Sequence, residues 1–139
     1  MDLSNTYLNW AQRNFHLNQI NNAEHQLIRA DVFLYLQQAI AKQKCFDLIV
    51  MDPPSFSNSK KMLDVLDVQR NHIKLIDAAM QLLSADGTLF FSNNLRGFEL
   101  DSTIEQLYQV VDVTKRSIPE DFRNQKIHQC WEICHKKSI

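Results

Sequence analysis

The feature that most limits the fold of this chain is a run of apolar residues at 46–51 that stops at Asp52, Pro53 and Pro54. Five of its six side chains are apolar, which is typical of a central parallel strand that is buried on both faces. The prolines end the strand because neither has a backbone N–H to donate to a sheet ladder. We therefore expect an α/β fold with Asp52 at the carboxyl end of a buried strand.

Helical and extended patterns alternate along the rest of the chain. Apolar residues recur at helical spacing in 4–18, 32–44 and 65–83, the last closed by Asp86 and Gly87, and 101–108 fits a short helix. Extended patterns occupy 26–30, 46–51, 88–92, 110–118 and 127–135. Because the last two strands follow one another, the sequence predicts a mostly parallel sheet with one antiparallel strand near its edge. At 139 residues the chain should form one domain.

Polar side chains follow the predicted strands at the edge where an α/β sheet binds its ligand. They are Asp2, Asp31, Asp52 and Asn93. A carboxylate in the position of Asp2 commonly accepts from ribose hydroxyls, and Asp31 could accept from an adenine amino group while Val32 packs on the ring. Asp2 and Asp31 could each instead cap the helix that follows, and for Asp31 both roles can hold at once.

The segment Asp52-Pro53-Pro54-Ser55-Phe56 is the sharpest motif in the chain. The prolines fix the backbone so that the Asp52 carboxylate and nearby carbonyls point into one cleft, and Phe56 offers a stacking face for a flipped base. An ordinary proline turn is the competing interpretation. The position of the segment after the most apolar strand favours a catalytic loop built from Asp52, Pro53, Pro54 and Phe56.

Four motifs carry a resemblance to a known family. They are FDLIVMDPPSFSNSK at 46–60, DVQR at 67–70, FSNNLRGF at 91–98 and IHQCW at 127–131. Together they closely resemble the C-terminal methyltransferase domain of bacterial bifunctional 23S ribosomal RNA guanine methyltransferases, over nearly the whole chain. The resemblance implies a Rossmann-like class I methyltransferase fold, S-adenosylmethionine as cofactor, and methylation of guanine N7 in 23S ribosomal RNA.

The resemblance also implies roles for individual residues. The cofactor would be held by Asp2, Leu3, Asp31, Val32 and Asp52, and the loop that begins at Asp52 would face the target base. Contacts with the substrate RNA are expected from polar and basic residues on or near the strand-end loops. These residues are Ser55, Asn58, Lys60, Arg70, Asn93 and Arg96.

The chain departs from the family pattern at its start. The family's first strand and glycine-containing loop would precede Asp2, where only Met1 stands. We therefore expect residues 1–139 to be the C-terminal part of one S-adenosylmethionine-dependent methyltransferase domain, truncated before the first strand and glycine loop. Its expected partners are 23S ribosomal RNA and the rest of the bifunctional chain, with a homodimer as a further option. Whether the isolated chain is active stays open.

The residues after the predicted strands also bear on which atom of the base receives the methyl group. Guanine N7 has an in-plane lone pair and no proton, so its methylation needs positioning more than a general base. Methylation of a pyrimidine carbon would need a nucleophile, normally cysteine, and related enzymes carry it after the strand that corresponds to 90–92. This chain has Asn93 and Asn94 there. For an exocyclic amine, an Asn-Pro-Pro loop would be at least as natural as the Asp-Pro-Pro loop of this chain. The sequence therefore favours a ring nitrogen.

Net charge, cysteine spacing and the length of apolar runs bear on nucleic-acid binding, redox environment, metal binding and membrane insertion. A net charge of −1 gives no general argument for nucleic-acid binding. The three cysteines form no CxxC pair, which favours reduced thiols in a cytoplasm, and no apolar run is long enough for a membrane span. Cys130 and Cys134 alternate along a strand with His128 and His135, so we expect no metal. The alternatives are a non-catalytic RNA-docking or dimerising remnant and a small-molecule methyltransferase.

Overall fold

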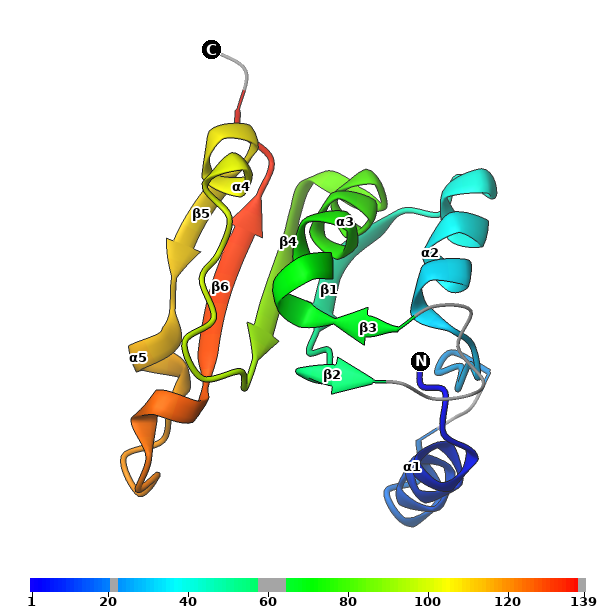
Figure 1. The fold of residues 1–139 in the computed structure, drawn as a ribbon. Coiled ribbons are helices and arrows are strands. Elements are labelled where there is room, and N and C mark those ends of the chain that lie inside the picture. The colour runs from blue at the N-terminus through cyan, green and yellow to red at the C-terminus, as the bar shows by residue number, and fades with distance from the viewer. Residues whose placement is uncertain (21–22, 58–64, 138–139) are drawn as a thin grey trace.

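The computed structural model describes residues 1–20, 23–57 and 65–137, which form a four-stranded mixed sheet, a separate two-stranded ladder and flanking helices (Figure 1). The helical elements are α1 (Asn5–Leu17), α2 (Val32–Ala41), α3 (Val68–Gln81), α4 (Ser102–Leu107), α5 (Thr114–Ser117) and the 3-10 turn η1 (Gln125–Ile127). The strands are β1 (Phe46–Met51), β2 (Phe56–Ser57), β3 (Leu66–Asp67), β4 (Leu83–Asn93), β5 (Gln109–Asp112) and β6 (Gln129–Cys134).

The main sheet has the strand order β1-β4-β6-β5 (Figure 1). Strands β1 and β4 are parallel, and β6 runs antiparallel to both of its neighbours, β4 and β5. Strands β1, β4 and β5 therefore share one direction, and their carboxyl ends meet at one edge of the sheet. This arrangement confirms the predicted α/β fold with one antiparallel strand next to the edge.

Side-chain caps begin three of the helices. Asp31 accepts from the backbone N–H groups of Phe33 and Leu34, at 2.9 and 3.2 Å, and so starts α2. Asp67 starts α3 and Asp101 starts α4 through bonds of the same kind. A carboxylate at this position satisfies amide groups that have no partner inside the helix. The predicted capping role of Asp31 is thus confirmed.

The core lies between α3 and the central strand β4. Leu75, Ile76 and Met80 on α3 are buried, as are Leu89 and Phe91 on β4. The ring of Phe91 lies 6.1 Å from that of Phe98 and 6.3 Å from that of Trp131, centroid to centroid. Because Trp131 belongs to β6, this aromatic cluster joins the antiparallel strand to the rest of the core.

The long helix ends earlier than the sequence predicts. Helix α3 stops at Gln81, and Asp86 and Gly87 lie inside strand β4. A Cβ atom on Gly87 would lie 2.8 Å from Leu83 Cγ and 3.0 Å from the Asp47 carbonyl oxygen. The register of β1 against β4 shifts between Phe46 and Leu48. Gly87 therefore serves a close approach of two strands and not a helix end.

Strand β1 is not buried on both faces, which corrects the prediction made from its composition. Leu48 is 59% exposed and Val50 is 70% exposed. Strand β1 is an edge strand of the four-stranded sheet, and within the described ranges only β4 pairs with it. The apolar pattern correctly predicts a strand at 46–51. It does not predict burial, because burial depends on which other elements cover the strand.

Two other predicted strands also differ from the observed ones, whereas the helix predicted at 4–18 is present as α1. The strand predicted at 26–30 forms only a single parallel bridge, between Asp2 and Arg29. The strand predicted at 110–118 ends at Asp112, whose Oδ1 accepts from the Thr114 backbone N–H and so turns the chain into α5. Helix α1 buries none of its residues, and its Tyr7 and Trp10 are 61% and 62% exposed.

Candidate functional site

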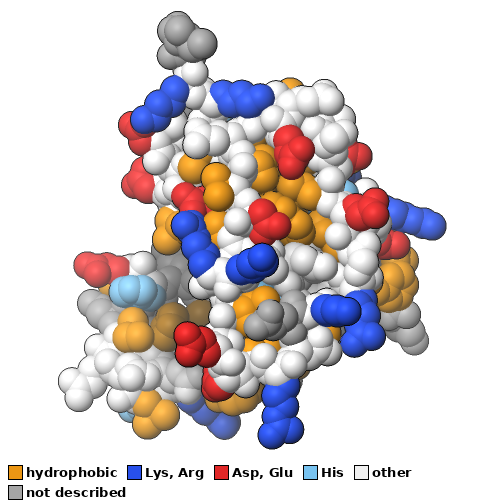
Figure 2. All heavy atoms as spheres, turned by 90° about the vertical axis from the view of Figure 1, so that its left-hand side faces the viewer, with side chains coloured by type: hydrophobic (Ala, Val, Ile, Leu, Met, Phe, Trp, Pro, Cys, Tyr) orange, Lys and Arg blue, Asp and Glu red, His pale blue; other side chains and the backbone are white. Residues whose placement is uncertain are grey.

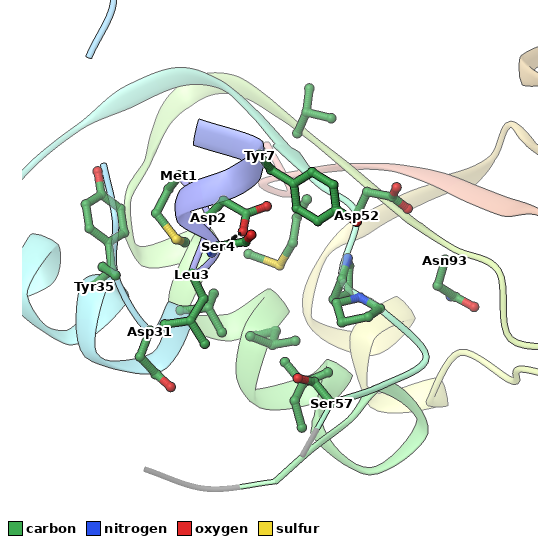
Figure 3. A pocket seen from close by; sticks show the side chains of 18 of the residues that line it. Met1, Asp2, Leu3, Ser4, Tyr7, Asp31, Tyr35, Asp52, Ser57 and Asn93 are labelled. Atoms are coloured by element: carbon green, nitrogen blue, oxygen red, sulfur yellow. Dashed lines mark hydrogen bonds between the residues drawn. The ribbon is translucent and has the colours of Figure 1, made fainter. Parts of the chain in front are cut away.

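A cavity of about 960 Å³ opens at the carboxyl ends of β1 and β4 and extends to the N-terminal segment (Figure 3). Its volume lies within the range of small-molecule sites. Eight residues predicted for the cofactor, the loop or the substrate line this cavity: Asp2, Leu3, Asp31, Val32, Asp52, Pro53, Pro54 and Asn93. The tertiary structure therefore brings together residues that are up to 91 positions apart in the sequence.

Asp2 is held beside the segment that leads to Asp31. Its backbone N–H donates to the Ile28 carbonyl at 3.0 Å, and its own carbonyl accepts from the Ala30 N–H at 3.1 Å. Its side-chain Oδ1 accepts from the Ser4 N–H at 2.7 Å, so the competing interpretation of Asp2 as a cap near the start of α1 holds as well. Capping occupies one carboxylate oxygen, and Asp2 still lines the cavity.

Asp31 has one carboxylate oxygen that is not used by the fold. The residue is only 6% exposed, and Oδ1 caps α2. Its Oδ2 is buried and has no hydrogen-bond partner among the described residues. A buried carboxylate oxygen without a donor is costly in free energy. Because Asp31 lines the cavity, Oδ2 is suited to accept from a ligand that enters there.

At the other end of the cavity, side-chain bonds tie the Asp52 loop to the end of β4. Ser92 Oγ donates to Asp52 Oδ1 at 2.8 Å, and Ser55 Oγ donates to Asn94 Oδ1 at 2.7 Å. Asn93 is fully buried: its Oδ1 accepts from the Leu95 N–H, and its Nδ2 has no partner among the described residues. Two adjacent parallel strand ends thus hold an exposed carboxylate in a fixed place.

Several predicted residues do not line this cavity. Phe56 is 59% exposed and lies opposite Asp67 in the β2–β3 ladder. Arg70 forms an ion pair with Asp67 at 3.6 Å and is otherwise solvent-exposed, and Arg96 is also exposed. Asn58 and Lys60 lie outside the described residues.

The structure adds lining residues that the sequence did not point to. Tyr7, Tyr35, Ser57, Asn94 and His128 all line the cavity. Tyr35 stands one helical turn after Asp31, and that spacing was a usable signal. His128 comes from the far end of the chain and reaches the cavity only because β6 pairs with β4.

Cys130 is the cysteine nearest to the Asp52 end of the cavity. Burial raises the pKa of its thiol, and the negative charges of Asp52 and Asp112 raise it further, while Ser117 and Arg116 act in the opposite direction. The thiol therefore stays protonated and is a poor nucleophile. This agrees with chemistry that needs no cysteine adduct.

Surface charge, possible metal-binding clusters and helix length bear on nucleic-acid, metal and membrane binding. On the face seen from the β5 side, Lys and Arg side chains are interspersed with Asp and Glu side chains (Figure 2). In residues 1–20, 23–57 and 65–137, no three or more His, Cys, Asp or Glu side chains are arranged to hold a metal ion. No helix within these ranges has the length and apolar character needed to cross a membrane.

No protein-family model matches the chain, but searches of known proteins and solved structures find similar ones. Ribosomal RNA large subunit methyltransferase K of Neisseria meningitidis serogroup B is 64% identical over 136 residues, which cover 98% of this chain and 38% of that protein. Ribosomal RNA large subunit methyltransferase K/L of Cellvibrio japonicus is 53% identical over 97% of this chain and 18% of its own length.

A solved methyltransferase complexed with SAH has the same fold, with a TM-score of 0.72 at 23% identity. The match covers 94% of this chain and 37% of that one. The chain thus spans well under half the length of each of these proteins. Over nearly all of its own length the chain is similar to the ribosomal RNA large subunit methyltransferases K and K/L, which confirms the resemblance stated from its motifs, and its fold is that of a methyltransferase.

Proposed function

We propose that this chain binds S-adenosylmethionine and takes part in the methylation of guanine N7 in 23S ribosomal RNA. The observation that carries the proposal is a single cavity that joins Asp2 and Asp31 at one end to the Asp52-Pro53-Pro54 loop at the other. Residues 1–139 would act as the C-terminal part of one methyltransferase domain, in the cytoplasm and together with the rest of a longer chain.

The residues at the first end of the cavity fit the nucleoside part of this cofactor. The free Oδ2 of Asp31 suits an adenine amino group, Val32 would offer an apolar contact for the ring, and Asp2 with Leu3 would hold the ribose. When bound, the cofactor's sulfonium supplies the methyl group. Asp52, at the other end of the cavity, would contribute both to holding the cofactor and to orienting the base.

At the acceptor end, the residues of this chain would orient the base. The exposed Asp52 carboxylate, held by Ser92, can accept from the N1 and N2 hydrogens of guanine. Its negative charge would also offset the positive charge that develops on the purine as N7 reacts. Because N7 carries no proton, no general base is required. The reaction also needs no cysteine nucleophile, which fits the raised pKa of the Cys130 thiol.

Contacts with the RNA around the target base are proposed for Ser55, Asn58, Lys60, Arg70, Asn93 and Arg96. Arg70 and Arg96 are exposed and free to meet phosphates, apart from the surface pairing of Arg70 with Asp67. On the face that Figure 2 shows, acidic and basic side chains are interspersed, so that face carries no broad basic field.

The identity of the product tests the proposal directly. The full-length protein that carries this chain should place one methyl group on a guanine of protein-free large-subunit RNA. Methylation at N7 leaves a cationic purine with a labile glycosidic bond, so reduction followed by aniline should cleave the RNA at that nucleotide. Mass spectrometry that finds the methyl group on an exocyclic amine or a pyrimidine carbon would contradict the N7 assignment and leave the fold unaffected.

The exposed ring of Phe56 gives a second prediction. If Phe56 stacks on the flipped base, Phe56→Ala should weaken RNA-dependent turnover by about 1–3 kcal/mol, the usual contribution of base stacking. Phe56→Tyr keeps an aromatic face and should retain most of the activity. Because Phe56 is 59% exposed, neither change should alter the urea midpoint of unfolding. A loss of stability without a change in turnover would assign Phe56 to packing instead.

A non-catalytic docking or dimerising role is the second candidate. It is favoured by the bare face of β1, where Leu48 and Val50 are largely exposed, and by helix α1, which buries none of its residues. Apolar surface of this kind often marks an interface. Saturable binding of S-adenosylmethionine by calorimetry separates the two candidates, because only the first requires it.

A further inference from the structure

His128 lies on the same side of the sheet as Asp52. Ser92 and Cys130 are register partners in the β4–β6 ladder, and Ser92 donates to Asp52. His128 precedes Cys130 by two residues in extended backbone, with φ −140° and ψ 131°, so its side chain points to the same face as that of Cys130. It also lines the cavity that holds Asp52, and it is only partly buried.

The hydrogen bonds of Ser117 indicate which nitrogen of the His128 ring carries the hydrogen. Ser117 Oγ donates to the Thr114 carbonyl at 3.0 Å, and it lies 3.0 Å from His128 Nε2. The Thr114 carbonyl can only accept, so when the single hydroxyl hydrogen lies on that bond, Oγ accepts from Nε2. In the neutral ring the hydrogen therefore sits on Nε2, which leaves Nδ1 as an acceptor. Nδ1 has no partner in the part of the chain that the structure describes.

We propose that His128 contacts the substrate, with Nδ1 accepting a hydrogen bond from the target guanine, and that Ser117 is the positioning residue that sets its tautomer. The proposal rests on the proposed function. Guanine carries adjacent donors at N1 and N2, and two acceptors, Asp52 and His128, line the same cavity. Adenine has no hydrogen on N1 or amino group on C2, so this pair of acceptors selects guanine at that edge.

Nitrogen-15 NMR of the histidine rings tests the contact without any need for turnover. In the full-length protein without added ligand, His128 should show the Nε2–H tautomer. Guanosine 5′-monophosphate, added in the presence of S-adenosylhomocysteine, should shift the Nδ1 signal of His128, and adenosine 5′-monophosphate should not. His135, whose Nε2 lies 3.3 Å from the Leu83 carbonyl oxygen, serves as the internal control. An Nδ1 signal that does not move at millimolar guanosine nucleotide, or that moves equally with adenosine nucleotide, overturns the proposal.

The nucleotide 7-deazaguanosine monophosphate separates this proposal from the assignment of N7 as the methylated atom. It keeps the N1 and N2 donors and lacks N7, so it should shift Nδ1 as the guanosine nucleotide does. That result would stand even if product analysis placed the methyl group on another atom. A response to guanosine nucleotide that is lost with the deaza analogue would instead show that the ring reads N7, and it would overturn the proposed contact.

Variants of the pair test the positioning role of Ser117. His128→Ala should weaken the binding of guanosine nucleotide by about two- to tenfold, the effect of one neutral hydrogen bond, and His128→Gln should restore part of it by supplying an acceptor. Ser117→Ala should populate the other tautomer in the nitrogen spectrum and weaken binding to a similar degree, with Ser117→Thr as the rescue. Unchanged tautomer and binding in Ser117→Ala, with only a lower stability, would show a merely structural role and refute the assignment.

Discussion

Replacing Asp52 by alanine is expected to lower methyl transfer by about 10²–10³-fold, as the loss of a positioned charge in other active sites does. The residue is exposed at the end of β1, and among the described residues its side chain bonds to Ser92, at the surface. The free energy of unfolding should therefore change by about 0.5 kcal/mol or less. Single-turnover methylation of large-subunit RNA by the full-length protein, together with urea unfolding, measures both effects.

Two further variants show which property of Asp52 matters. Asp52→Asn keeps an oxygen that can accept from Ser92 but loses the negative charge, so it should be nearly as inactive as the alanine variant if charge stabilisation dominates. Ser92→Ala leaves the charge and removes the bond that orients it, and it should have a smaller effect. Full activity in Asp52→Ala would remove the loop from the mechanism.

Replacing Phe91 by alanine is expected to lower the free energy of unfolding by about 3–5 kcal/mol. The side chain is completely buried in β4, against Phe98 and Trp131, and its removal would leave a cavity at the centre of the aromatic cluster. A loss of this size is a large share of the roughly 5–15 kcal/mol that stabilise an ordinary domain. Much of the variant should therefore be unfolded in mild urea.

The controls for Phe91 come from the same chain. Phe91→Leu keeps most of the apolar volume and should cost clearly less than the alanine change. Val50→Ala shortens a side chain that is 70% exposed on β1, and it should leave the urea midpoint almost unchanged. If Val50→Ala were as destabilising as Phe91→Ala, the bare face of β1 would have to be covered in solution.

Much of the candidate site was visible in the sequence because its signals are local. The apolar run at 46–51 followed by two prolines identified a strand end, and Asp31 before a helical pattern identified a cap. Both depend on interactions within a few residues. The resemblance carried by the family motifs added the expected cofactor and substrate class, and one similar protein is 64% identical over 98% of the chain.

Only the tertiary structure decided which of these residues meet. The backbone bonds of Asp2 to Ile28 and Ala30 place two carboxylates beside one cavity, and His128 enters it through the pairing of β6 with β4. The predicted burial of β1 and the predicted helix end at Gly87 were wrong for the same reason. Strand pairing and coverage depend on contacts between distant segments, whereas periodicity and turn residues report only on neighbours along the chain. The sequence by itself therefore determined the elements, the caps and the loop that follows β1, and the tertiary contacts determined the composition of the cavity and which strand face stays bare.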